Sequence, residues 1–254
     1  MISIAMSYYN RLELLKYTLR SISQSSVDKK DYEIVIVDDF SNNENSLDSI
    51  RNFNGMNIKI IKMSDRVSEK NYSNPCIPFN VAFKESIGDI VIIQNPECCH
   101  AGDVLNFCSK NSTHDSYLTF CCYSLNKNDT EYLHKNGNFN LVNRSVTSDG
   151  DSGWYNHHIY RPVGYHFTSC ITRKNLNRLN GFDEKYARGH GYDDNEFLYR
   201  INLMKLNIRF IDNPFVVHQF HYSGSTDTSK ISQDNSKLFS EYTQKRNIIE
   251  ANKD

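Results

Sequence analysis

Five acidic or imidazole side chains follow apolar runs or a glycine-containing turn, and their chemistry is the most informative feature of the sequence. They are Asp39, Glu97, Asp193, Asp194 and His218. Carboxylates and imidazoles are ligands of Mn²⁺ and Mg²⁺, so Glu97 and His218 could hold a cation that stabilises an anionic leaving group. A carboxylate whose pKa is raised by burial or by a like charge nearby can deprotonate a hydroxyl, which suits the adjacent pair Asp193 and Asp194. The pattern indicates metal-assisted group transfer.

The first half of the chain alternates predicted strands and helices. Strands are expected at 2–6, 32–39, 57–63 and 89–93. Helices are expected around the apolar sets Leu12, Leu15, Leu19 and Ile22; Leu47, Ile50 and Phe53; and Phe79, Ala82, Phe83 and Ile87. Because the strands are apolar throughout, we expect an α/β fold with a mostly parallel central sheet and helices on both faces. Ligands of such sheets bind at the carboxyl ends of the strands, where 7-SYYNR-11, Asp38-Asp39 and 94-QNPE-97 would meet.

The second half is less regular. A strand is expected at 116–123, a long surface loop or mobile cover at the polar stretch 124–153, and a short helix at 174–179. The segment 154–173 gathers aromatic residues, histidines and an arginine, and the chain beyond residue 224 is polar, with a peripheral helix expected there.

The order of these motifs resembles family 2 glycosyltransferases of the GT-A fold, over about residues 1–222. The resemblance is carried by a first strand ending in Tyr-Asn-Arg, by IVIVDDFS, by a carboxylate-bearing turn after the fourth strand, by GFDE-x-Y, by DDNEF leading to Arg200, and by a late histidine. It implies a single GT-A domain over 1–222, with a nucleotide-binding half at 1–100 and an acceptor and catalytic half at 101–222. Residues 223–254 would be a polar extension.

The resemblance implies roles on the donor side. Asp39 matches the aspartate that hydrogen-bonds the nucleotide base, and Ser7, Tyr9 and Arg11 match the loop along the nucleotide. Asn95 and Glu97 fall on the Asp-x-Asp metal motif, with Glu97 as the metal ligand. Asn95 replaces the first aspartate, so one negative charge is missing and metal binding would depend more on the donor's phosphates.

On the catalytic side, the resemblance implies that the pair Asp193 and Asp194 contains the base, which we expect to be Asp194. His218 matches a late histidine that ligates Mn²⁺ or Mg²⁺ in some relatives, and His221 competes with it for this role. Direct displacement with inversion at the anomeric carbon is the implied mechanism.

A set of aromatic and polar residues could bind the acceptor, because an aromatic ring stacks on the apolar face of a sugar and polar groups fix its hydroxyls. The candidates are Trp154, His158 and Arg161, together with His157 and His166. Their alternative interpretation is a hydrophobic cluster under the long loop.

Each site residue also has a purely structural interpretation. Asp38 and Asp39 could form a turn, Asp193 could be a helix N-cap, Glu97 could be a solvated loop acid, and His218 could lie at a strand end. A nucleotidyltransferase would need a glycine-rich loop after the first strand, and 7-SYYNRLELL-15 contains no glycine. The remaining rival is a catalytically weak or inactive sugar-nucleotide or glycan-binding protein.

Composition narrows the cellular setting. With 29 basic and 30 acidic residues the net charge is -1, which argues against a general nucleic-acid partner. No stretch is long and apolar enough for a transmembrane segment, and seven cysteines without a CxxC pattern suggest free thiols in a reducing compartment, the cytoplasm. We therefore expect a metal-dependent glycosyltransferase that moves a sugar, expected to be UDP-linked, to a hydroxyl of a glycan or glycoconjugate.

Overall fold

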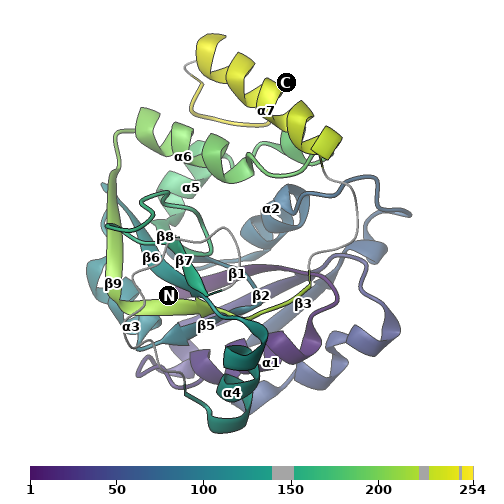
Figure 1. Ribbon diagram of the computed structural model, residues 1–254, viewed down its shortest axis with the longest axis vertical. Helices are drawn as coiled ribbons and strands as arrows, with labels where there is room; N and C mark the ends of the chain where they lie inside the picture. The colour runs from purple at the N-terminus through teal and green to yellow at the C-terminus, as the bar shows by residue number, and fades with distance from the viewer. Residues whose placement is uncertain (139–151, 223–228, 246–247, 254) are drawn as a thin grey trace.

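A computed structural model of the chain describes residues 1–138, 152–222, 229–245 and 248–253. Within these residues the strands form one nine-stranded sheet, in the order β3-β2-β1-β4-β8-β6-β9-β5, with β7 paired to β6 (Figure 1). Their bounds are Ile2–Tyr8 (β1), Tyr32–Asp38 (β2), Ile58–Lys62 (β3), Ile90–Gln94 (β4), Cys98–Ala101 (β5), Ser116–Ser124 (β6), Gly153–Asn156 (β7), Thr168–Thr172 (β8) and Asn207–His218 (β9).

The sheet is mostly parallel, as predicted. β1, β2, β3, β4, β6 and β9 run in one direction, whereas β5, β7 and β8 run in the other. The first four strands are parallel neighbours; helices cover both faces of β1, β2 and β4, which are almost wholly buried, whereas β3 at the edge of the sheet is only partly buried. Their carboxyl ends therefore meet at one edge, and this edge positions the site described below.

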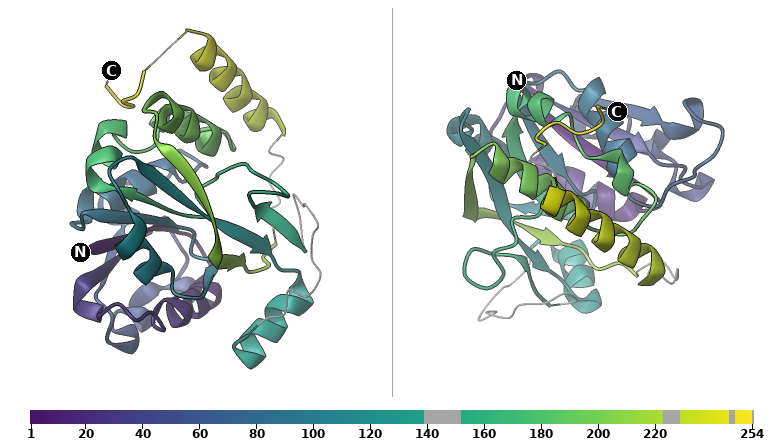
Figure 2. Two further views of the ribbon diagram at one scale, coloured as in Figure 1. Left: turned by 90° about the vertical axis from the view of Figure 1, so that its left-hand side faces the viewer. Right: turned by 90° about the horizontal axis from the view of Figure 1, so that it is seen from above.

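Helices pack on both faces of the sheet (Figures 1 and 2). They are Leu12–Ile22 (α1), Cys76–Glu85 (α2), Val104–Asn111 (α3), Lys127–Asn136 (α4), Arg173–Leu179 (α5), Asp193–Leu203 (α6) and Ser229–Lys245 (α7). One core cluster contains Leu15 and Leu19 of α1 with Leu105 of α3. A second contains Phe79 of α2 and Phe197 of α6, so it lies on the opposite face. α7 packs outside α6.

The predicted helix around Leu47, Ile50 and Phe53 is wrong. The chain instead makes three short 3-10 helices, at Asn43–Asn45, Leu47–Ile50 and Phe53–Gly55. The side chains of Asn42 and Ser46 accept backbone N–H groups here. Such local bonds compete with a continuous α-helix. The other error in this half is Ile87, which lies beyond the end of α2 and is 74% exposed.

The polar stretch 124–153 is not a simple loop. Asn126 caps α4 by accepting the N–H of Asp129, and Gly137, with φ 70°, ends the helix in the left-handed conformation. The predicted loop residues 139–151 lie outside the described part of the chain. The segments β5 and α3 were also not predicted.

Candidate active site

The turn after β4 is held by a buried amide. Gln94 is fully buried, its Nε2 donates to the carbonyl of Cys98 at 2.6 Å, and its Oε1 accepts from Thr168 at 3.0 Å. The N–H of Asn95 donates to the carbonyl of Phe167 at 3.0 Å. The amide at the end of this core strand therefore fixes the turn that presents Asn95 and Glu97.

The loops after β1 and β2 are joined to each other. The N–H of Asn10 donates to the hydroxyl of Ser41 at 3.0 Å, and the N–H of Asp39 donates to the carbonyl of Tyr8 at 2.8 Å. The two aspartates then differ in role: Asp38 accepts the N–H of Ser41 at 3.0 Å and shapes the turn, whereas Asp39 faces a cavity.

This cavity lies at the carboxyl edge of the sheet and gathers the predicted donor-side residues. It has a volume of about 210 Å³ and is lined by Ser7, Tyr9, Arg11, Asp39, Lys70, Ser73, Pro75, Phe79, Asn95, Pro96 and Glu97. All six donor-side residues named from the sequence, Glu97 included, are in this set. Clefts with a few convergent polar groups are where small ligands bind.

Glu97 is the centre of a charged cluster. Its Oε1 lies 2.8 Å from Arg11 Nη1, 3.3 Å from His218 Nε2 and 3.7 Å from His221 Nε2. Burial alone would raise the pKa of Glu97, but the charge of Arg11 and the hydrogen bonds of the two histidines outweigh it and hold that pKa well below its usual range. Pairing of Cys98 with His218 across β5 and β9 places the histidine next to the carboxylate.

The same cluster fits a divalent cation. Glu97, His218 and His221 each offer a ligand atom, and these atoms lie within 4.8 Å of one another. Within the described residues, the buried Glu97 Oε2 and His218 Nδ1 have no hydrogen-bond partner. One carboxylate and two imidazoles form a donor set that Mn²⁺ accepts, and both histidines considered from the sequence belong to it.

Asp39 is paired within the protein. Its Oδ2 lies 2.6 Å from Lys70 Nζ, and its Oδ1 accepts the hydroxyl of Tyr72 at 2.6 Å. The ammonium of Lys70 also lies 4.5 Å from the ring centroid of Tyr9, which is half exposed. Lys70 and Tyr72 come from the loop after β3, the neighbouring strand at the same edge.

The acidic pair begins α6. The turn before it has Gly191 and Tyr192 in the left-handed conformation, and Asp193 is the first helical residue, so it is not the N-cap. Asp193 is buried and accepts Asn74 Nδ2 at 2.7 Å. Burial, followed by the charge of Asp194, raises the pKa of Asp193.

Asp194 is the more accessible acid, with 26% of its side chain exposed. Its Oδ1 lies 2.5 Å from His166 Nδ1 and accepts the N–H of His166 at 3.1 Å. Burial lowers the pKa of His166, but the charge of Asp194 prevails and the net shift is upward. The ring of His166 makes an edge contact with Phe79, which lines the cavity, so His166 and Phe79 connect Asp194 to the cavity wall.

Glu196, the third acid of this segment, is structural. Its two oxygens lie 2.5 Å and 2.7 Å from Nε and Nη2 of Arg200, and neither side chain is more than 1% exposed. Arg200 also donates to the carbonyls of Leu179 and Gly181. This pair joins α6 to the end of α5.

The predicted acceptor residues lie on β7 and the turn after it. Trp154 packs against Tyr123 and Phe215 in a hydrophobic cluster, as its alternative interpretation suggested. His158 pairs with Asp212. Arg161 donates to the carbonyl of Tyr155.

It is Tyr155, the neighbour of Trp154, whose ring contacts His218, with centroids 5.1 Å apart. The segment 155–167 thus borders the Glu97 cluster through Tyr155 and Phe167, and the acidic pair through His166.

Comparison with known proteins gives the family of the chain and its fold. A family model described as glycosyltransferase-like family 2 matches residues 4–225. The chain belongs to this family. No protein of curated function matches the chain by sequence.

Solved glycosyltransferase structures share the GT-A fold. S. aureus TarS 1–349 in complex with UDP-GlcNAc superposes with a TM-score of 0.64 at 17% identity, covering 93% of this chain and 64% of that one. A longer S. aureus TarS structure gives 0.60 at 16% identity, covering 86% and 36%. The mannosyltransferase PcManGT from Pyrobaculum calidifontis, in complex with GDP-Man and Mn²⁺, gives 0.56 at 14% identity, covering 88% and 58%. The chain therefore spans less than two thirds of each of these structures.

Several residues around this candidate site were not predicted from the sequence. The loop after β3 contributes Lys70, Tyr72, Ser73 and Asn74. Ligands bind at the carboxyl ends of parallel strands, and this holds for β3 as it does for β1, β2 and β4. The sequence suggested His166 only as an acceptor-binding residue. Its contact with Asp194 joins residues 28 positions apart and leaves no sequence signal.

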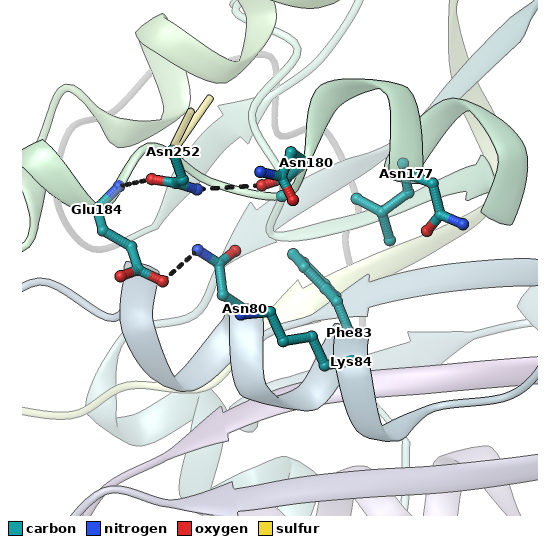
Figure 3. A pocket seen from close by; sticks show the side chains of 9 residues that line it. Asn80, Phe83, Lys84, Asn177, Asn180, Glu184 and Asn252 are labelled. Carbon is teal, nitrogen blue, oxygen red and sulfur yellow. Dashed lines mark hydrogen bonds between the residues drawn. The ribbon is translucent and has the colours of Figure 1, made fainter. Parts of the chain in front are cut away.

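A second cavity, between α2, α5 and the C-terminal segment, is lined by Asn80, Phe83, Lys84, Asn177, Asn180, Glu184 and Asn252, among others (Figure 3). Its amides bind the chain itself. Asn252 accepts the N–H of Glu184 at 2.9 Å and donates to the carbonyl of Asn180 at 3.1 Å, and Asn80 Nδ2 lies 3.0 Å from Glu184 Oε1. These hydrogen bonds hold the C-terminal segment around Asn252 against the rest of the chain.

Among the described helices, none is both long and apolar enough to cross a membrane.

Proposed function

We propose that the chain transfers a sugar from a nucleoside-diphosphate donor, a UDP-sugar, to a hydroxyl of a glycan or glycoconjugate, with inversion at the anomeric carbon. The observation that carries the proposal is the cavity lined by Arg11, Asp39 and Glu97, whose wall residue Phe79 contacts His166, the partner of Asp194. The UDP-GlcNAc complex of TarS supports the choice of donor.

In this proposal the donor lies along the loop after β1. Ser7, Tyr9 and Asn95 line its path, the exposed ring of Tyr9 faces the nucleotide, and Asp39 hydrogen-bonds the base. Arg11 and Lys70 supply positive charge beside the diphosphate. Residues 1–100 then form the nucleotide-binding half and 101–222 the acceptor and catalytic half, with 223–254 as an extension.

Glu97, His218 and His221 would hold Mn²⁺ or Mg²⁺, which neutralises charge on the leaving diphosphate when bound. Support comes from the unpartnered Glu97 Oε2 and from the Mn²⁺ complex of the mannosyltransferase.

Asp194 is proposed as the general base, because it is the more accessible acid of the pair. His166 orients its carboxylate through two contacts. Asp193, buried and bound to Asn74, places a second carboxylate beside Asp194. Trp154, His158 and Arg161 remain the proposed acceptor residues. They lie in or next to the segment 155–167, which contacts the Glu97 cluster through Tyr155 and Phe167 and the acidic pair through His166.

All seven cysteines are free and buried. This agrees with the proposed cytoplasmic setting, because a reducing compartment keeps thiols unpaired.

The test is release of nucleoside diphosphate from a panel of UDP- and GDP-sugars, with and without Mn²⁺, in the wild type and in Asp194→Asn. A positioned general base contributes about 10²–10⁴-fold, so Asp194→Asn should lose that factor in turnover while keeping donor affinity. The matched control is Asp65→Asn, an exposed acid in the loop after β3, which should keep full turnover.

Unchanged turnover in Asp194→Asn would remove the base assignment. Donor binding without turnover by the wild type, with every donor and with glycan acceptors, would favour the binding-protein alternative, which the neutral Asn95 keeps in consideration.

A further inference from the structure

A second group of metal-binding side chains lies on the sheet, outside the proposed donor and base sites. It consists of Cys121, His157, His158 and Asp212, whose ligand atoms lie within 4.8 Å of one another. They are contributed by β6, by the turn after β7 and by β9. The proposed transfer reaction makes no use of Cys121, His157 or Asp212.

The register of three neighbouring strands brings the group together. Cys122 pairs with Asn156 of β7, which places Cys121 beside His157. On the other side, Phe120 pairs with Ile211 and Cys122 with Val216, so the register shift in β9 leaves Cys121 opposite the bulge that begins at Asp212. Bulges re-aim side chains in this way.

One carboxylate oxygen connects the group. Asp212 Oδ1 accepts the thiol of Cys121 at 2.8 Å and lies 2.7 Å from His158 Nδ1. Cys121 is fully buried, whereas the side chains of His158 and Asp212 are 41% and 47% exposed. The group is thus anchored on the core side and open to solvent on the other.

His157 takes a different position from the other three. Its Nδ1 accepts the N–H of Ile159 at 3.1 Å, which holds the ring against the turn, and its ring stacks on that of His158 with centroids 4.7 Å apart. An imidazole whose Nδ1 accepts a hydrogen bond carries its proton on Nε2. His157 therefore supports the orientation of His158 and becomes a fourth ligand only if this bond is given up.

The donor set selects a class of cation. A thiolate with imidazole and carboxylate suits Zn²⁺ and its analogue Co²⁺, and disfavours Mg²⁺ and Ca²⁺, which prefer oxygen. Tetrahedral bonds of ordinary length put neighbouring ligand atoms about 3.3–3.6 Å apart, so the present separations of 2.7 Å and 2.8 Å need to open by about 0.6–0.8 Å. The exposed side chains of His158 and Asp212 have the freedom to do so.

We propose that Cys121, His158 and Asp212 form a binding site for a zinc-class divalent cation, with His157 adjacent and with an open position toward solvent. In the metal-free protein, burial and the hydrogen bond to Asp212 raise the pKa of the Cys121 thiol. A coordinating cation reverses this preference and releases the thiol proton to solvent, and coordination through His158 Nδ1 requires the ring proton to move from Nδ1 to Nε2 by exchange with solvent. The bound cation would link β6, β9 and the turn 157–161. The site does not depend on the proposed glycosyltransferase activity.

The experiment is titration of the full-length, chelator-treated protein with Co²⁺, a spectroscopic substitute for zinc. A thiolate-to-cobalt charge-transfer band in the near ultraviolet is expected to saturate at one equivalent. Cys121→Ser should abolish this band, and His158→Ala and Asp212→Asn should each weaken the affinity by about tenfold or more. Because His158 and Asp212 are exposed, these two variants keep the test valid even if Cys121→Ser does not fold.

Two controls separate this site from others. His114→Ala removes an exposed histidine away from the group and should leave the band unchanged. Glu97→Gln alters the cluster of Glu97, His218 and His221 and should also retain the band, so failure of the proposed donor site would not remove this signal. Zn²⁺ should raise the thermal midpoint of the wild type and of His114→Ala by the same amount, and that of His158→Ala by less. Absence of the band in the wild type, or its persistence at full affinity in His158→Ala and Asp212→Asn, would overturn the proposal.

Discussion

Removing the guanidinium of Arg11 should have opposite effects on metal and nucleotide binding. Arg11 Nη1 lies 2.8 Å from the oxygen of Glu97 that also faces both histidines, so a cation at this cluster competes with an ion pair already present. In Arg11→Ala this competitor is gone, and Mn²⁺ should bind more tightly in the absence of nucleotide. Binding of a nucleoside diphosphate should weaken, because a positive charge of the cavity is lost.

The size of the effect follows from the separation of the charges. Two unit charges 2.8 Å apart interact by about 1.5 kcal/mol in water and by about 6 kcal/mol at an effective dielectric constant of about 20. Because the Arg11 side chain is 34% exposed, the lower figure applies. A change of about 1.5 kcal/mol corresponds to roughly a tenfold tighter Mn²⁺ affinity.

The assay is Mn²⁺ titration followed by electron paramagnetic resonance of the free ion, with nucleotide binding measured in parallel by calorimetry. Lys70→Ala is the matched control, because Lys70 lines the same cavity but pairs with Asp39. It should weaken nucleotide binding and leave Mn²⁺ affinity unchanged. An Arg11→Ala protein that is folded and binds Mn²⁺ no more tightly than the wild type would refute the competition described here.

Two further predictions concern stability. Burial lowers the pKa of His100 from 6.5 to about 3. The unfolded chain therefore binds a proton that the native state does not. The free energy of unfolding decreases as the pH is lowered between these values, by about 2 kcal/mol from pH 6.5 to pH 5. Urea unfolding at pH 7 and pH 5 should show this loss, and His100→Gln should lose that much less; an equal loss in both proteins would contradict it. Glu196→Gln leaves Arg200 as an unpaired buried charge and should cost about 3–5 kcal/mol, seen by calorimetry as a melting temperature lower by about 6–20 °C. Glu13→Gln, whose pair with Lys16 is exposed, should change little, and a similar shift in both variants would show that burial is not the cause.

The parts of the fold that the sequence predicted are those in which local pattern and burial agree. The strands Ile2–Tyr8, Tyr32–Asp38 and Ile90–Gln94 are buried on both faces, and the last two are rich in β-branched residues, so their apolar pattern identifies them. Cys98–Ala101 has no such composition, and it is a strand because it pairs with β9. Tertiary pairing decides its conformation.

The site shows the same division. The donor-side residues were predictable because the carboxyl ends of parallel strands must meet, and residues at the ends of β1, β2 and β4 do line one cavity. The partners of these residues were not predictable. That Lys70 pairs with Asp39, and that His166 contacts Asp194, depends on the path of loops in space.

The pairing of Asp39 with Lys70 and of Glu97 with Arg11 means that the cavity carries its own counter-ions. In the proposed reaction, an incoming diphosphate would have to draw these cations toward itself, so it would exchange one set of ion pairs for another and gain only the difference. When the product leaves, the internal pairs form again. Such an exchange keeps ground-state affinity modest and favours rapid departure of the spent nucleotide, a step that limits turnover in many enzymes.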